Sequence, residues 1–221
     1  MTDEQSTPEN RRPLKVRGVG LVNQFARWLS QKSITPNHIS LLSIVFALFA
    51  AICLLIVPQY GGGQKVVLYV LAALLIQGRL LCNLFDGLVA IEGGKSTASG
   101  ELFNDIPDRI SDPLIIIAAG YSIVSVTYGD ILGWCGALLA VLTAYIRTLA
   151  VSIGAPANFT GPMAKQHRMA LLTFACIATA FEQYFWQHDY VMLIALIILN
   201  LGCVLTNWRR ASLAYHFLEK K

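Results

Sequence analysis

Residues 81–113 hold six of the thirteen acidic side chains in a sequence that is otherwise rich in apolar residues. Asn83 and Asp86 are three positions apart, so on a helix their side chains share one side and their oxygen atoms converge. A second polar stripe follows at intervals of four residues: Asn104, Asp108 and Asp112. Two antiparallel helices joined by the short loop at 91–100 would bring the two stripes face to face.

Carboxylate and amide oxygens are hard ligands that suit Mg²⁺, Mn²⁺ or Ca²⁺ better than zinc. Near a membrane surface, each unpaired carboxylate costs roughly a few kcal/mol, so a cation is expected among these acids. A bound divalent metal is one candidate. A network of cationic side chains is another, and its members would be Arg79, Lys95, Arg109 and Arg147. Simple capping of a solvated helix end is a third explanation, and the spacing alone leaves all three open.

The elements that position these residues are predicted to be membrane helices, because 55% of the side chains are hydrophobic and only 14% are charged. Residues 39–57 carry no charge over about 19 positions, the length that a helix needs to cross roughly 30 Å of hydrocarbon. Five more apolar runs follow, at 66–90, 114–126, 131–146, 169–181 and 190–204. The runs that start at 114 and 169 are short, so we expect the more polar turns before them to complete those helices. The predicted fold is an all-α integral membrane protein with six transmembrane helices.

The distribution of positive charge predicts the orientation in the membrane. Lysine and arginine residues gather before the first apolar run and after the last one, and others fall between runs on the same side: Lys95, Arg109, Lys165 and Arg168. Only Lys65 lies on the opposite side. The positive-inside rule therefore places both termini and the acidic cluster in the cytosol, in a multi-pass protein of a bacterial-type inner (cytoplasmic) membrane.

The segments outside the apolar runs are assigned as follows. Residues 1–17 are predicted to be disordered. Residues 18–32 have apolar side chains on one face and form a predicted amphipathic N-terminal helix, which either lies on the inner leaflet or packs against the protein. Residues 18–208 then form one membrane domain, and 209–221 form a cytosolic tail. The five cysteines and four histidines show no metal-ligand spacing.

Residues 83–108 follow the pattern N-x2-D-G-x2-A-I-x8-G-x3-N-x3-D. This pattern resembles the signature of the CDP-alcohol phosphotransferase (CDP-alcohol phosphatidyltransferase) family, D-x2-D-G-x2-A-R-x8-G-x3-D-x3-D, with every spacing kept. Three further segments are similar to the family, the last two less specifically: ITPNHISLLSI at 34–44, AYIRTLAVSIG at 144–154 and GPMAKQHR at 161–168. The resemblance covers about residues 30–208.

Three positions depart from the family pattern. Asn83 and Asn104 stand where the family has metal-binding aspartates, and Ile91 replaces an arginine that in the family contacts nucleotide phosphates. Asp86 and Asp108 keep the other two acids. An amide retains an oxygen ligand but lacks a negative charge, so we expect weaker metal binding, or one ion instead of two.

Two conservative replacements with all glycine spacings intact indicate a functional subgroup. Asp105 and Asp112 are candidates to restore the missing negative charge, although Asp105 is turned about 100° from Asn104 on a helix. Arg79, one turn before Asn83, is a candidate for the missing phosphate contact.

The resemblance implies an enzyme that transfers a phosphoalcohol group, such as a phosphatidyl group, from a CDP-alcohol to an acceptor hydroxyl with release of CMP, in phospholipid synthesis. Mg²⁺ or Mn²⁺ would be held by Asp86, Asp108, Asn83 and Asn104. Asp108 would also act as the general base. The CDP moiety would contact Asn83, Gly87, Ala90, Gly100 and Arg79.

Three cations are candidates for binding an anionic acceptor: Arg147, Lys165 and Arg168. A guanidinium grips a phosphate bidentately, which favours a phosphorylated polyol. Membrane anchoring of Lys165 and Arg168, and a salt bridge from Arg147 to one of the acids, are the alternatives. The expected partners are the CDP-alcohol lipid donor, the alcohol or polyol acceptor, membrane lipids and a second copy of the chain in a homodimer, with no nucleic acid.

A second function stays open because three signature positions have changed. In it, the protein is a catalytically weak or inactive relative that binds a CDP-lipid or a membrane protein partner without turnover.

Overall fold

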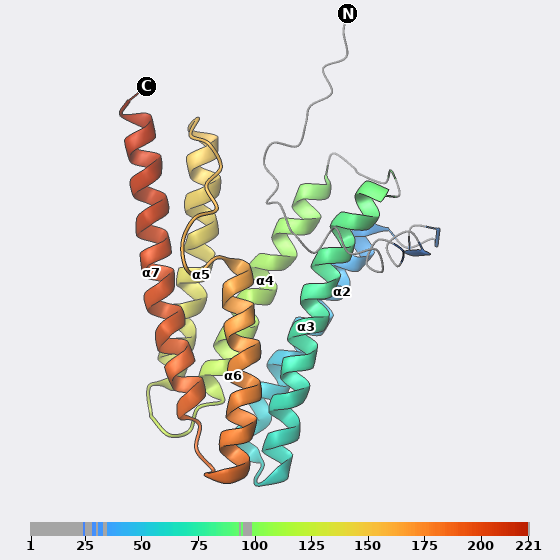
Figure 1. The fold of residues 1–221 in the computed structure, drawn as a ribbon, viewed down its shortest axis with the longest axis vertical. Coiled ribbons are helices and arrows are strands. Elements are labelled where there is room, and N and C mark those ends of the chain that lie inside the picture. The colour runs from blue at the N-terminus through green and yellow to red at the C-terminus, as the bar shows by residue number, and fades with distance from the viewer. Residues whose placement is uncertain are drawn as a thin grey trace, which may run out of the picture.

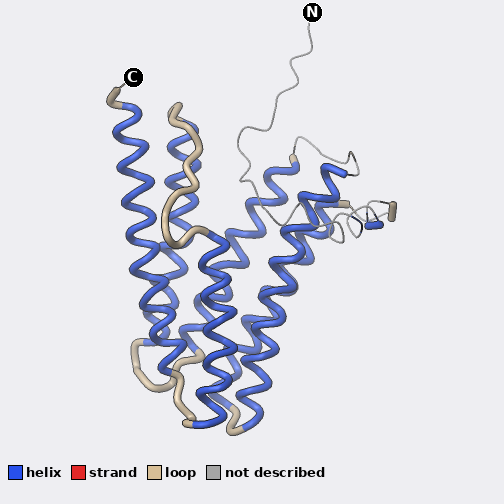
Figure 2. Tube along the Cα trace, in the orientation of Figure 1, coloured by secondary structure: helices blue, strands red, loops and turns tan. Residues whose placement is uncertain are grey.

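The computed structural model describes residues 35–92 and 99–220, together with residues 24, 28, 29, 31, 32 and 94. This part of the chain is a bundle of helices without strands (Figures 1 and 2). Its elements are the helices α2 (Pro36–Ile56), α3 (Gly63–Glu92), α4 (Gly100–Tyr121), α5 (Gly129–Ser152), α6 (Lys165–Phe185) and α7 (Tyr190–Leu218), and the short 3₁₀ turn η2 (Val57–Gln59). The prediction of an all-α protein is confirmed for these residues. The predicted disordered segment at 1–17 and most of the amphipathic segment at 18–32 lie outside them.

Helix α2 begins at a local signal. The side-chain oxygen of Thr35 accepts a hydrogen bond from the backbone N–H of His38 at 3.3 Å. Pro36 occupies the first turn, where a missing N–H leaves no helical bond unmade. After η2 the chain turns back into α3, and α2 then packs along both α3 and α4. Helices α3 and α4 thus each pack along α2, and the polar side chains of Arg79 and Asn83 on α3 reach Asp108 on α4.

The two short apolar runs belong to longer helices. Helix α4 begins at Gly100, well before Leu114, and helix α6 begins at Lys165, before Met169. The expectation that polar turns complete both helices is confirmed. Helix α4 carries two prolines within its length, and both helices place charged side chains in their first half.

The predicted end of α4 is wrong. The apolar run extends to Val126, but the helix stops at Tyr121. The buried carboxylate of Asp189 accepts hydrogen bonds from the backbone N–H groups of Val124 at 2.7 Å and Ser125 at 3.3 Å. Because these two donors are used outside a helical ladder, the chain turns here toward α5.

Helices α4 and α5 approach one another backbone to backbone. A Cβ atom added at Gly120 would lie 2.6 Å from the carbonyl oxygen of Gly129 and 2.8 Å from the Cα of Gly133. Only glycine permits this separation, as at other close crossings of membrane helices. The crossing fixes the end of the bundle opposite to the acidic cluster.

Helix α7 is fastened to α5 by three polar side chains. They donate to carbonyl groups of α5, Asn200 to Leu132 at 3.1 Å, Asn207 to Leu139 at 3.2 Å and Arg210 to Thr143 at 2.8 Å. Helix α7 continues to Leu218, beyond the apolar run that ends at 204, so most of the segment assigned as a tail at 209–221 is helical.

In the part of the chain that the structure describes, four helical segments are long and apolar enough to cross a membrane: Pro36–Gln59, Gly63–Ile91, Gly129–Ser152 and Tyr190–Leu218. Large apolar side chains point outward along them, among them Leu74, Leu138 and Leu201. This surface is that of a protein whose exterior is solvated by lipid. Helices α4 and α6 lack such an apolar window because of their polar first turns.

Candidate active site

The acidic cluster lies where α3, α4 and α6 meet. On each helix the contributing residues are three or four positions apart, so they share one face. The members are Arg79, Asn83 and Asp86 from α3, Asp105, Asp108 and Asp112 from α4, and Lys165 and Arg168 from α6. The predicted meeting of the α3 and α4 stripes is thus found, with α6 as a third contributor.

Asp108 is the centre of the cluster and is buried. Its Oδ1 atom accepts from Arg79 Nη2 and from Asn83 Nδ2, both at 2.8 Å. Its Oδ2 atom pairs with the ammonium group of Lys165. The carboxylate is therefore held in one orientation by two cations and one amide.

Asp112 is one helical turn further along α4 and lies deeper. Arg79 Nη2 is 2.6 Å from its Oδ1 atom, and Arg168 Nη2 is 2.8 Å from its Oδ2 atom. Arg168 also donates to the backbone oxygen of Met163 at 2.8 Å. All three charged side chains are at most 2% exposed, so this ion-pair network ties α3, α4 and α6 together in the interior.

Asp86 differs from the other two buried acids because its partners are neutral. Ser40 on α2 donates from its hydroxyl to Oδ2 at 2.7 Å, and the backbone N–H of Gly87 donates to Oδ1. Within the described residues no lysine or arginine forms an ion pair with this carboxylate. Asp86 therefore lies beside Asn83 and Asp108 without a cation in direct contact among the described residues.

Asp105 forms a separate, half-exposed pair of salt bridges at the rim. Arg109 lies 2.7 Å and Arg147 lies 3.0 Å from its Oδ1 atom. The Arg147 guanidinium also lies over the ring of Phe159, 5.2 Å from its centroid. The salt-bridge alternative for Arg147 is thus present in the structure.

The remaining predicted residues lie around this cluster. Asn104 is exposed on α4, one turn before Asp108, and Ile91 is exposed at the end of α3. Gly87 and Ala90 are half-buried on α3, and Gly100 begins α4. Lys95 lies outside the described residues.

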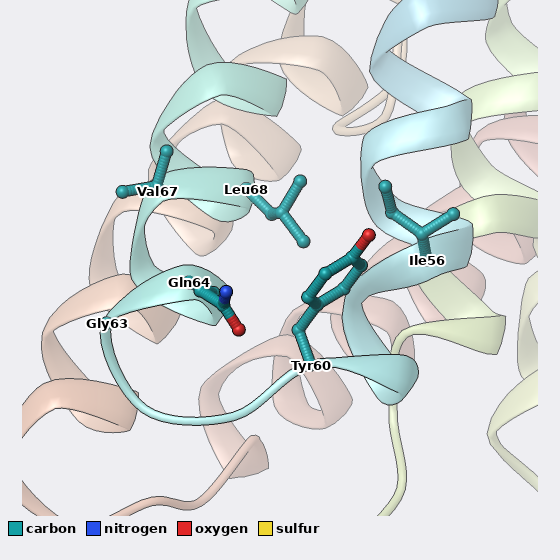
Figure 3. Close-up of a pocket in the computed structure, with 6 residues that line it drawn as sticks. All are labelled: Ile56, Tyr60, Gly63, Gln64, Val67 and Leu68. Atoms are coloured by element: carbon teal, nitrogen blue, oxygen red, sulfur yellow. The ribbon is translucent and has the colours of Figure 1, made fainter.

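A cavity of about 560 Å³ opens at the other end of the bundle, between the end of α2 and the start of α3 (Figure 3). Its lining is mostly apolar, with Tyr60 and Gln64 as the polar side chains, and Ile56, Gly63, Val67 and Leu68 complete it. It contains no acid, base or cation, so it is not the candidate site despite its size.

Comparison with known proteins agrees with the sequence signature. The profile of the family described as CDP-alcohol phosphatidyltransferase matches residues 33–208, most of the chain. The chain belongs to this family. A relative in Escherichia coli (strain K12), the inner membrane protein YnbA, is 24% identical over an alignment of 178 residues, and the match covers 78% of this chain and 82% of that protein.

Solved structures share the fold. The phosphatidylinositol phosphate synthase PgsA1 of Mycobacterium tuberculosis with CDP-DAG bound gives a TM-score of 0.73 at 19% identity, covering 89% of this chain and 94% of that one. The same enzyme in complex with manganese and citrate gives 0.72 at 18% identity, covering 88% of each chain. The arrangement of helices in Figure 1 is therefore the fold of these solved structures.

The oxygen donors in the cluster of this family member fit a divalent ion. Across the described ranges there is no group of three or more His, Cys, Asp or Glu side chains that could hold a metal ion without other ligands. Asn83 donates from Nδ2 to Asp108 and so keeps its Oδ1 atom as a ligand. The carboxylates of Asp86 and Asp108 with amide oxygens are hard donors suited to one Mg²⁺ or Mn²⁺.

Two contributors to the site were not identified from the sequence. Ser40 lies within the family-like segment 34–44, but nothing in its spacing links it to Asp86, which is far along the chain. Thr206 on α7 accepts from the backbone N–H of Met163 at 3.0 Å and so fastens the loop that leads to Lys165. A lone threonine in an apolar run gives no sequence signal for this contact.

Proposed function

We propose that the protein is a membrane phosphotransferase that moves a phosphoalcohol group from a CDP-alcohol, such as CDP-diacylglycerol, to an acceptor hydroxyl and releases CMP, in phospholipid synthesis. The observation that carries the proposal is the convergence of Asn83, Asp86 and Asp108 in one buried cluster with the spacing of the family signature. A divalent ion, Mg²⁺ or Mn²⁺, would be held there by these residues with Asn104, and would neutralise charge on the donor's two phosphates.

Asp108 would accept the proton of the attacking hydroxyl. The hydroxyl oxygen forms a bond to the phosphorus that carries the alcohol group, the bond from that phosphorus to the bridging oxygen breaks, and CMP leaves. Arg79 and Lys165 hold the two oxygens of Asp108, which orients the carboxylate for this transfer. This fixed orientation supports the proposed role, and the hydroxyl proton would go to a carboxylate lone pair that Arg79, Asn83 and Lys165 leave unused.

The donor would lie along the face of α3 that carries the signature. Gly87 and Ala90 leave room for the cytidine beside Asp86, and Gly100 allows the chain to approach it from the start of α4. Arg79 would supply charge near the phosphates in place of the arginine that Ile91 replaces. The lipid part of the donor would lie between helices in the inner leaflet.

Lys165 and Arg147 are the cations that we propose for the acceptor. About a quarter of each side chain is exposed, 27% for Lys165 and 25% for Arg147, so both are accessible to a phosphorylated polyol. Arg168 is 2% exposed, and its part in the acceptor site would be to support Lys165 from within the same helical turn.

We further propose that all six helices span the membrane, because the buried charges of α4 and α6 are paired with Arg79 of α3 or with one another. Both termini and the acidic cluster would face the cytosol of an inner membrane protein, and two copies would form a homodimer as in the family pattern. Residues 18–208 would be one domain, with an interfacial helix at its start.

The test is CMP release by the purified protein. CDP-diacylglycerol is incubated with a panel of polyols and polyol phosphates and with Mg²⁺ or Mn²⁺, and CMP is measured. We expect release that requires both an acceptor and a divalent ion. Intact nucleotide binding without CMP release across the panel would overturn the enzyme and support the alternative, a weak or inactive relative that binds a CDP-lipid or a membrane protein. The observation that favours the alternative is the pairing of both Asp108 oxygens with cations.

A further inference from the structure

We infer that the ammonium group of Lys165 takes the place of a second metal ion, so that the site binds one divalent cation per chain. The inference rests on the proposed function for the presence of the first ion. It goes beyond that function because it assigns the second positive charge to a side chain of this protein.

The position of Lys165 is the first observation. Its ammonium group pairs with Oδ2 of Asp108, a residue that the family pattern assigns to metal binding. It also lies within electrostatic range of Asp86 and Asp112. An ammonium group is a compact point charge with three donors, so it can occupy a place among carboxylates that a metal ion would otherwise fill.

The charge balance is the second observation. Three buried carboxylates, those of Asp86, Asp108 and Asp112, are matched by three cations, Arg79, Lys165 and Arg168. The two phosphates of a CDP-alcohol carry one negative charge each, and one divalent ion neutralises them. A second divalent ion would leave two positive charges without a counter-charge between helices, where charges are costly to bury.

The two asparagines complete this balance. With aspartate at positions 83 and 104, the site would carry two further negative charges, which is the charge of one more divalent ion. The amides at positions 83 and 104 lower the negative charge of the site, and the ammonium group at Asp108 neutralises part of what remains. Both changes reduce the number of divalent ions that the site needs for neutrality. Local geometry supports this, since Asn83 shares Asp108 with Lys165 through the other carboxylate oxygen.

The experiment is a count of bound Mn²⁺ on the purified protein in detergent with saturating CDP-diacylglycerol and no acceptor, by equilibrium dialysis and by electron paramagnetic resonance of free Mn²⁺. We expect one Mn²⁺ per chain in the natural protein. We expect Lys165→Gln to bind Mn²⁺ at least about ten-fold more tightly than the natural protein does, because a competing positive charge has been removed. In the triple variant Asn83→Asp, Asn104→Asp, Lys165→Gln we expect a second ion to bind.

Lys65→Gln is the matched control, since Lys65 begins α3 at the opposite end of the bundle, and its Mn²⁺ affinity should equal that of the natural protein. Lys165→Arg keeps the charge and should keep one ion. Thermal unfolding shows whether Lys165→Gln is folded, and if it is not, the count on the natural protein decides.

Two Mn²⁺ ions of comparable affinity on the natural protein, no bound Mn²⁺, or unchanged affinity in folded Lys165→Gln would each overturn the inference. The result is separate from the fate of the proposed reaction. One bound Mn²⁺ without CMP release would remove the reaction and leave the inference, whereas two bound ions with CMP release would do the reverse.

Discussion

At the scale of single residues, the two signature acids that this chain keeps have different surroundings. Asp86 is held by a hydroxyl and a backbone N–H, while Asp108 is held by two cations and an amide. Neutral donors orient a carboxylate without cancelling its charge. Asp86 is therefore expected to be the stronger attractor for a positive ion, whereas Asp108 is the more firmly oriented of the two.

Replacing Ser40 by alanine should weaken Mn²⁺ binding and CMP release by about ten-fold, because a hydrogen bond to a charged group is worth roughly 1.5–3 kcal/mol. Ser43→Ala is the matched control. Ser43 is also buried on α2, but its hydroxyl donates to the backbone oxygen of Ser40 and does not reach the cluster. Equal losses of Mn²⁺ binding and CMP release in the two variants would show that the hydrogen bond from Ser40 to Asp86 is not the cause.

Asp108→Asn should abolish CMP release while donor binding falls much less. The amide fills the same space but cannot take a proton from the attacking hydroxyl. Turnover and the dissociation constant of a CDP-alcohol are measured on the same preparation, with Asp105→Asn at the rim as a comparison. Unchanged turnover in Asp108→Asn would remove this residue from the role of base.

The sequence predicts which residues share a helix face but not which cation reaches which acid. Spacing places Asn83 and Asp108 opposite each other, and the structure joins them. The partners of Asp112 depend on how α3 and α6 are rotated, and that is decided by packing far from the signature. For this reason the pairing with Arg168 could not be read from the chain.

At the scale of helices, α4 and α6 are longer than the apolar runs that predict them, because their first turns are polar. Each reads as a short apolar run, because charged residues in its first turns interrupt the pattern that identifies a span. Those charges are satisfied by the neighbouring helices, so the helix continues through them. Periodicity thus predicts the existence of each helix, while its start depends on partners that are distant in sequence.

Gly120→Ala should destabilise the protein by about 1–3 kcal/mol, the usual cost of overpacking. The new methyl group would meet backbone atoms of Gly129 and Gly133, which cannot move without separating α4 from α5. The midpoint of thermal unfolding in detergent measures the effect. Gly61→Ala, where a Cβ would meet nothing within 4 Å, is the control and should leave the midpoint unchanged.

At the scale of the whole molecule, the described cations gather at one end of the bundle. The C-terminal end of α7 and the cluster helices carry them, whereas Lys65 is at the other end. Figure 1 shows the C-terminus at the end opposite to the connection between α2 and α3. The sequence predicts this asymmetry well, because it depends only on the order of apolar runs.

The predicted orientation is tested by cysteine labelling in intact cells, after the five native cysteines have been replaced. Gly61→Cys, between α2 and α3, should react with a membrane-impermeant maleimide added outside. Lys220→Cys, after α7, should react only when the inner membrane has been permeabilised. The opposite pattern would contradict a cytosolic active site.

The ion pairs of Asp112 also bear on how the chain enters the membrane. Arg79 precedes Asp112, but Arg168 follows it by 56 residues. At 5–20 residues per second, synthesis delivers this second partner on the order of several seconds later. In the proposed topology, in which α4 spans the membrane, α4 would enter with Arg79 as the first partner of Asp112, and Arg168 would arrive later with α6. The acidic cluster would then be completed late in synthesis, by Arg168.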